Sequence, residues 1–134
     1  GLLERVRDAA RGGMPIFGTC AGAILLAKRI ARSDQPRLGL MDMEVERNAY
    51  GRQVESFEAA FSSPFFDGEP LRAVFIRAPI IRSVGASVDV VASYEDQPVV
   101  VRQGSLLAAT FHPELTEDGR LHAFFLSMIS GQLD

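Results

Sequence analysis

The sequence has little of several features that mark particular classes of protein. It contains one cysteine, Cys20, so no disulfide can form within the chain, and we expect a cytoplasmic protein. No apolar run approaches the roughly 18–20 residues that a membrane-spanning helix needs, and no secretory signal is visible. The formal net charge is −3, which argues against a broad basic surface for nucleic acid or acidic membranes.

What is present predicts one ordinary globular domain over residues 1–134. The chain is 47% hydrophobic and 23% charged, a balance that is typical of folded proteins and not of disordered ones. Its length is enough to bury a single core. The first residue is Gly1 and not methionine, which is consistent with a missing N-terminus.

Apolar periodicity predicts an alternation of helices and strands. We expect helices over 1–11, 23–30 and 121–129, strands over 14–18, 43–47, 54–61, 73–76, 88–92, 99–102 and 106–111, a loop over 62–71 and a tight connection at 95–98. Strands buried on both faces, mixed with helices, predict a layered α/β sheet. Consecutive strands without a helix between them predict that this sheet is mixed, with an antiparallel portion.

The single cysteine stands in the segment Gly18–Gly22, between a buried strand and a buried helix. A nucleophile at such a junction sits on a sharp turn that exposes its side chain at the carboxyl edge of the sheet. Gly18 and Gly22 are expected to remove Cβ atoms where the backbones crowd. The helix that begins near Ala21 is expected to lower the pKa of Cys20, and the Ala21 N–H to serve as an oxyanion donor. A glycine-containing turn that merely holds a cysteine remains the alternative.

A histidine and a carboxylate follow the last buried strand. If that strand and the strand before Cys20 are parallel neighbours, His112 should lie near the thiol. Pro113 favours an extended His112, and Glu114 would then lie on the same side, able to accept a hydrogen bond from the imidazole. Cysteine, histidine and carboxylate together make a complete nucleophile system. Alternatively, these are a hydrogen-bonded histidine and a solvated carboxylate, and we interpret His122 as a surface or packing residue.

These motifs resemble the class I (triad) glutamine amidotransferases. The resemblance rests on Phe17–Gly22 (FGTCAG) and Phe111–Leu115 (FHPEL). Most of that class carry glutamine two residues after the second elbow glycine, whereas this chain has Ile24, as in the glutaminase subunits of pyridoxal 5′-phosphate synthase. Segments 45–48, 51–53, 75–79 and 112–118 also resemble those subunits, so the similarity covers nearly the whole chain.

The resemblance implies a fold and an activity. The fold is a three-layer, flavodoxin-like sandwich with a mixed, mostly parallel central sheet, here lacking the N-terminal strand and helix of that family and a segment that supplies the second oxyanion donor. The activity is hydrolysis of L-glutamine to L-glutamate and ammonia, which a synthase subunit uses to make pyridoxal 5′-phosphate. No cofactor and no metal are implied, and the sequence as it stands should be slow or inactive alone, since one lost oxyanion donor costs about 10²–10³ in turnover.

The resemblance also assigns roles to single residues. It makes Cys20 the nucleophile, His112 the acid–base, Glu114 the residue that orients His112, and Arg47, Ile76 and Arg77 the glutamine contacts. Without the resemblance, Arg47 and Arg77 would be interpreted as surface arginines. Two other hypotheses stay open: another cysteine hydrolase of related fold, such as a peptidase or a glyoxalase-like enzyme, and an inactive, truncated binding partner.

Overall fold

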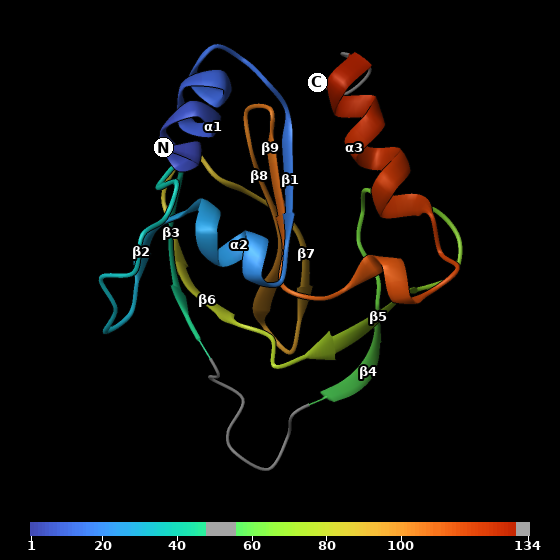
Figure 1. Cartoon of the computed structure of the whole chain (residues 1–134). Helices are drawn as coiled ribbons and strands as arrows, with labels where there is room; N and C mark the ends of the chain where they lie inside the picture. The colour runs from blue at the N-terminus through green and yellow to red at the C-terminus, as the bar shows by residue number, and fades with distance from the viewer. Residues whose placement is uncertain (48–55, 131–134) are drawn as a thin grey trace.

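The computed structural model describes residues 1–47 and 56–130 (Figure 1). The elements, in chain order, are α1 (Leu2–Arg11), β1 (Ile16–Thr19), α2 (Ala21–Leu26), β2 (Ala27–Ile30), β3 (Met41–Glu46), β4 (Ser56–Phe61), β5 (Leu71–Ile76), β6 (Ile80–Val84), β7 (Asp89–Tyr94), β8 (Gln97–Gln103), β9 (Leu106–Ala109), the 3₁₀ turn η1 (Pro113–Leu115) and α3 (Arg120–Ser130). Asn48, the 51–53 segment and the start of the strand predicted over 54–61 lie outside the described residues.

The strands form one larger and two smaller sheets. Their orders are β1-β9-β8-β7, β2-β3-β6 and β4-β5. The pairs β1–β9 and β2–β3 are parallel, and the other four described pairs are antiparallel. The predicted α/β class and mixed sheet are confirmed. Antiparallel pairs nevertheless outnumber parallel ones in the described part of the chain, unlike the mostly parallel sheet expected, because short connections such as the β7–β8 and β8–β9 turns make successive strands antiparallel.

The larger sheet separates two hydrophobic cores, so the three-layer arrangement is present. In Figure 1, α1 and α2 lie on one side of β1 and β9, and α3 lies on the other. Side chains of β9 alternate between the two sides: Leu106 and Ala108 enter the first core, and Leu107 and Ala109 enter the second. A strand covered on both faces has no polar side, which explains why this segment of the sequence is continuously apolar.

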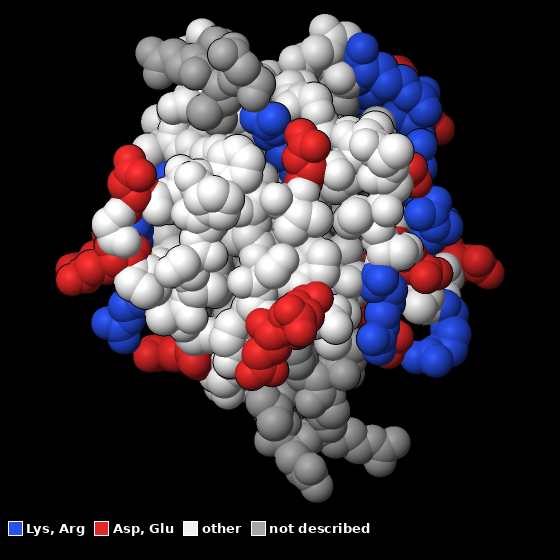
Figure 2. Space-filling model, turned by 180° about the vertical axis from the view of Figure 1, so that it is seen from behind, with Lys and Arg blue, Asp and Glu red and all other residues white. Residues whose placement is uncertain are grey.

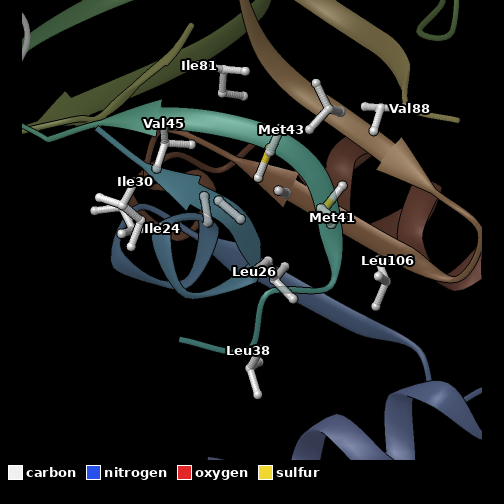
Figure 3. Packing of buried hydrophobic residues seen from close by; sticks show 14 residues of the cluster. Ile24, Leu26, Ile30, Leu38, Met41, Met43, Val45, Ile81, Val88 and Leu106 are labelled. Carbon is white, nitrogen blue, oxygen red and sulfur yellow. The ribbon is translucent and has the colours of Figure 1, made fainter. Parts of the chain in front are cut away.

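The first core packs α2 and β2 against β3 (Figure 3). The members labelled in Figure 3 are Ile24, Leu26, Ile30, Leu38, Met41, Met43, Val45, Ile81, Val88 and Leu106. Met41, Met43 and Val45 are fully buried, while the acidic residues between them are half-buried, which is the alternation predicted for this strand. The second core lies beneath α3, which contributes Leu121 and Phe124.

The helix predicted over 23–30 is shorter than expected. It ends at Leu26, and Ala27–Ile30 forms β2 instead. The carbonyls of Leu25 and Leu26 accept hydrogen bonds from the N–H groups of Leu38 and Leu40, at 2.7 and 2.9 Å, in place of donors one helical turn further on. Pairing with a distant segment therefore outweighs the helical pattern of the sequence.

One strand, β6, was missed by the sequence pattern, whereas the turn between β7 and β8 was predicted. β6 was not predicted, because its five residues lack a clean alternation; it pairs antiparallel with β3. The tight connection expected at 95–98 is confirmed as the turn between β7 and β8. Glu95 and Asp96 both have positive φ, 50° and 63°, as the two central residues of a type I′ hairpin turn require.

The surface carries charges of both signs. On the face shown in Figure 2, uncharged residues occupy the middle, and lysine and arginine lie mainly along one side with aspartate and glutamate among them. Within residues 1–47 and 56–130, no helix has both the length and the apolar character needed to cross a bilayer.

Candidate active site

Cys20 sits on a strained turn between β1 and α2. Its φ of 50° and ψ of −105° are unusual for a residue with a side chain, and such strain is characteristic of functional positions. The Cys20 N–H donates to the Ala109 carbonyl at 2.9 Å. That bond extends the parallel pairing of β1 with β9, in which Thr19 lies opposite Ala109. The sharp turn predicted from the sequence is confirmed, and so is the parallel pairing of β1 with β9 on which the predicted nearness of His112 to the thiol depended.

The two glycines of the elbow differ in what they contribute. A Cβ on Gly18 would lie 2.7 Å from the backbone carbon and oxygen of Gly22 and 2.8 Å from Leu26 Cδ1. A Cβ on Gly22 would meet nothing within 4 Å. The prediction that crowding demands glycine is therefore right for Gly18 and wrong for Gly22, because Gly22 approaches β1 with its backbone and its own Cβ direction is open.

The pKa of the Cys20 thiol is raised, whereas the sequence predicted that it would be lowered. Burial raises its pKa, and the negative charge of Glu114 raises it further, while a hydrogen bond from the Ala21 N–H lowers it less than these two effects raise it. The expectation of a lowered pKa is wrong, because α2 has only six residues and the thiol is partly removed from water. The thiol donates to the Ile76 carbonyl, with the sulfur 3.6 Å from the oxygen.

His112 and Glu114 form a hydrogen-bonded pair. His112 has the extended backbone expected before Pro113, with φ −106° and ψ 90°. Its Nδ1 lies 2.8 Å from Glu114 Oε2. The chain reaches this contact through a 3₁₀ turn, closed by the Leu115 N–H on the His112 carbonyl at 3.2 Å, and not through the extended chain predicted.

The contacts of Glu114 favour its ionised form. Burial raises the pKa of Glu114, but hydrogen bonds from its own backbone N–H and from His112 outweigh burial, so that the pKa is lowered overall. An ionised Glu114 can accept a hydrogen bond from Nδ1–H of His112, an arrangement that leaves Nε2 as the ring nitrogen able to exchange protons with substrate.

The end of β5 connects these two parts of the site. The Val74 carbonyl accepts the His112 N–H at 2.9 Å, and the Ile76 carbonyl, two residues on, accepts the Cys20 thiol. The negative charge of Glu114 is close enough to the Cys20 sulfur to raise the pKa of the thiol. The structure thus gathers the three residues at the carboxyl ends of β1 and β9. Neither backbone carbonyl could be found from the sequence, since a main-chain acceptor leaves no residue signature.

The predicted substrate contacts are exposed. Arg47 follows β3, and its guanidinium donates to the Gln35 side chain. Ile76 ends β5 with 38% of its surface exposed, and Arg77 follows with a positive φ of 46°. His122 lies at the surface, as predicted, with its ring edge-to-face against Phe17 at 5.7 Å between centroids.

A cavity of about 480 Å³ lies on the Glu114 side of the site. Its lining residues are Glu58, Arg72, Glu114, Leu115, Thr116, Glu117 and Asp118. Sequence reasoning missed it, because Glu58 and Arg72 come from the distant β4–β5 hairpin. Among the residues that the structure describes, no group of three or more histidine, cysteine, aspartate or glutamate side chains is arranged to hold a metal ion.

Alkylation of Cys20 is expected to need a higher pH than alkylation of free cysteine. Only the thiolate reacts with iodoacetamide, and burial and Glu114 both raise the pKa of the thiol. Glu114→Gln should shift the pH profile of the reaction to lower pH, because it removes a negative charge that destabilises the thiolate. The rates are measured by intact-mass spectrometry across pH, with Glu117→Gln as the matched control. A profile at or below that of free cysteine, or one that Glu114→Gln leaves in place, would contradict this prediction.

Comparison with solved structures places the fold among glutamine amidotransferases. A crystal structure of a glutamine amidotransferase superposes with a TM-score of 0.90 at 51% sequence identity, covering 97% of this chain and 69% of that one. A glutamine amidotransferase of Thermotoga maritima reaches a TM-score of 0.60 at 17% identity, over 98% of this chain and 56% of the other. This second likeness shows the fold alone.

Sequence comparison agrees. The pyridoxal 5′-phosphate synthase subunit PdxT of Moorella thermoacetica is 57% identical over 128 residues, which cover 96% of this chain and 68% of that protein. PdxT of Thermotoga maritima is 54% identical over 128 residues, covering 96% and 66%. The chain thus spans about two thirds of the length of these relatives. The profile of the SNO glutamine amidotransferase family matches residues 1–131. The resemblance stated from the motifs is confirmed: the chain belongs to the SNO glutamine amidotransferase family.

Proposed function

We propose that this protein hydrolyses L-glutamine to L-glutamate and ammonia with Cys20, His112 and Glu114, and delivers the ammonia to a subunit that makes pyridoxal 5′-phosphate. The observation that carries the proposal is the meeting of the strained Cys20 turn and the His112–Glu114 pair at the end of β5. Family membership and the names of the PdxT relatives support the same reaction.

The first half of the reaction forms a thioester. His112 Nε2 takes the proton of the Cys20 thiol, and the sulfur attacks the side-chain carboxamide carbon of glutamine. The π electrons of the carbonyl move to its oxygen, which accepts a hydrogen bond from the Ala21 N–H. When the carbonyl re-forms, the C–N bond breaks, and the imidazolium of His112 gives its proton to the leaving nitrogen. Ammonia departs.

The second half releases glutamate. Water attacks the thioester carbon while His112 Nε2 accepts a proton from it, and the C–S bond breaks as the carbonyl re-forms. The sulfur leaves with a proton from His112, which restores the thiol. Throughout both halves, the Glu114 carboxylate accepts a hydrogen bond from Nδ1–H of His112, which orients the ring and stabilises the imidazolium when it forms. A raised thiol pKa in the free protein makes this proton transfer to His112 a necessary part of the first step.

Substrate recognition is assigned to Arg47 and to the Ile76–Arg77 segment. A guanidinium group suits the α-carboxylate of glutamine, because its parallel N–H donors match the two carboxylate oxygens. The side chain of Gln35 supports Arg47 by accepting a hydrogen bond from it. The Ile76–Arg77 segment lies just after Val74, whose carbonyl binds His112, and the Ile76 carbonyl itself binds the Cys20 thiol.

Ammonia chemistry explains the need for a partner. At neutral pH free ammonia is mostly ammonium, which is a poor nucleophile, so the product must reach its acceptor before it is protonated in bulk water. The relatives are named as subunits of pyridoxal 5′-phosphate synthase, which makes the synthase subunit the partner in this proposal. The chain itself is proposed to need no cofactor, and a cytoplasmic location remains a prediction from the sequence.

The proposal is tested by glutamate release and by active-site labelling in the presence of the synthase subunit. The glutamine analogue 6-diazo-5-oxo-L-norleucine should modify one residue, Cys20, as identified by peptide mapping. Labelling should abolish glutamate release in the same proportion. An unlabelled Cys20 would favour another cysteine hydrolase, of the peptidase or glyoxalase type. Binding of the synthase subunit without glutamate release would favour the non-enzymatic alternative.

A further inference from the structure

The segment from His112 to Asp118 carries two members of the proposed triad, yet few of its side chains are packed in the protein interior. Pro113 is its one buried residue, and Leu115 is 52% exposed. Glu114 and the four residues after it line the cavity of about 480 Å³. A segment that lines a cavity and has few buried side chains is positioned little by side-chain packing. The position of Glu114 must therefore depend on the hydrogen bonds at the two ends of this segment.

The two ends are anchored to β5 and to the loop that leads into it. At the first end, the His112 N–H donates to the Val74 carbonyl at 2.9 Å. At the far end, the Asp118 N–H donates to Thr116 Oγ1 at 3.3 Å, and the Asp118 carboxylate accepts from Arg120. Asp118 also accepts the Arg120 backbone N–H at 3.1 Å, which starts α3.

The Arg120 guanidinium uses all of its nitrogens in this anchor. Nε and Nη2 donate to the Asp118 carboxylate, at 2.9 Å to Oδ1 and 2.6 Å to Oδ2. Nη1 donates to the carbonyls of Asp67 and Glu69 at 2.7 Å each, and Nη2 also donates to that of Pro70 at 3.3 Å. Only a planar group with five donors can satisfy one carboxylate and three carbonyls together. Lysine has three donors on one atom and cannot reproduce the arrangement.

We propose that Arg120 is a positioning residue of the glutaminase site, which acts through Asp118 to hold the His112–Glu114 segment on the same frame as Cys20. The inference rests on the proposed function. The frame is β5 with its leading loop: Asp67–Pro70 bind Arg120, Val74 binds His112, and Ile76 binds the Cys20 thiol. A single strand thereby sets the spacing between the nucleophile and its base. Movement of about 1 Å at such a site can cost on the order of 100-fold in rate.

The test compares Arg120→Lys with Arg102→Lys in the protein together with its synthase subunit. Arg102 also pairs with a carboxylate, Asp89 at 3.3 Å, but lies in register with Leu107, toward the opposite end of the sheet from Cys20. Arg120→Lys should lower kcat for glutamine about 10- to 100-fold and leave KM within about twofold, because the glutamine contacts remain. Arg102→Lys should leave both constants unchanged. Asp118→Asn, which keeps one acceptor and the start of α3, should show a smaller fall in kcat.

A second measurement does not depend on glutamine. Proton NMR of the wild-type protein should show a downfield Nδ1–H resonance of His112, assigned by its loss in Glu114→Gln. In Arg120→Lys and in Asp118→Asn this resonance should weaken or shift upfield. If both variants keep it unchanged, or if kcat is retained while only the melting temperature falls, Arg120 is merely structural and the inference is overturned. A wild-type protein that shows the resonance but releases no glutamate together with the synthase subunit would overturn the proposed function instead, and the resonance in the variants would still decide the role of Arg120.

Discussion

Replacing Cys20 by alanine is expected to lower kcat for glutamine hydrolysis by a factor on the order of 10⁵–10⁶, and His112→Ala by a similar factor. Residues that act as one nucleophile system lose nearly the whole rate when either is removed. The double variant should therefore be no slower than the slower single variant. Glutamate release in the presence of the synthase subunit measures all three variants against wild type.

The second histidine supplies a matched control. His122→Ala removes an imidazole that lies at the surface against Phe17, so kcat should remain within about twofold of wild type. Two results would contradict the triad. One is a rate for Cys20→Ala that stays near wild type. The other is a double variant slower than either single variant by a further large factor, since that would show Cys20 and His112 contributing independently.

Gly18→Ala is expected to destabilise the fold by about 1–3 kcal/mol, the usual cost of forcing an extra carbon into a packed site. The added Cβ would lie 2.7 Å from the Gly22 backbone, which cannot move without displacing the start of α2. Gly22→Ala is the matched control. Its Cβ would meet no atom within 4 Å, and alanine in a helix is favoured over glycine by about 1 kcal/mol.

Urea unfolding of both variants measures the difference. The Gly18→Ala midpoint should fall, the Gly22→Ala midpoint should stay or rise, and the slopes should remain equal. Gly18→Ala should also slow alkylation of Cys20 or change its pH profile, because the turn that carries the thiol must shift with α2. Equal stability of the two variants would show that the elbow tolerates a side chain at Gly18 and that the close approach is not a constraint.

Much of the candidate site could be predicted from local sequence. The glycine-bounded junction around Cys20 predicts a strained turn through steric exclusion alone, and Pro113 restricts the backbone of His112 through its ring. Continuous burial of 106–109 follows from its uninterrupted apolar run. These features depend on a residue and its immediate neighbours, so the sequence contains the information that determines them.

Other features depend on where distant segments lie. The pKa of Cys20 rises because tertiary burial and the charge of Glu114 outweigh the short helix beside it. Arg120 reads as an ordinary surface arginine in the sequence, and it becomes an anchor because the carbonyls of Asp67, Glu69 and Pro70 converge on it. Backbone carbonyls have no sequence identity, so no motif could indicate these contacts.

Local sterics and periodicity were therefore sufficient to define most of the elements, though not β2 or β6, and to predict the strained cysteine turn and the motif that joins His112 to Glu114. Tertiary contacts were needed to end α2 at Leu26, to pair β6 with the distant β3, and to join both halves of the site to β5. These outcomes rest on hydrogen bonds and charges between segments far apart in the chain, whose energies exceed local preferences once the chain is folded.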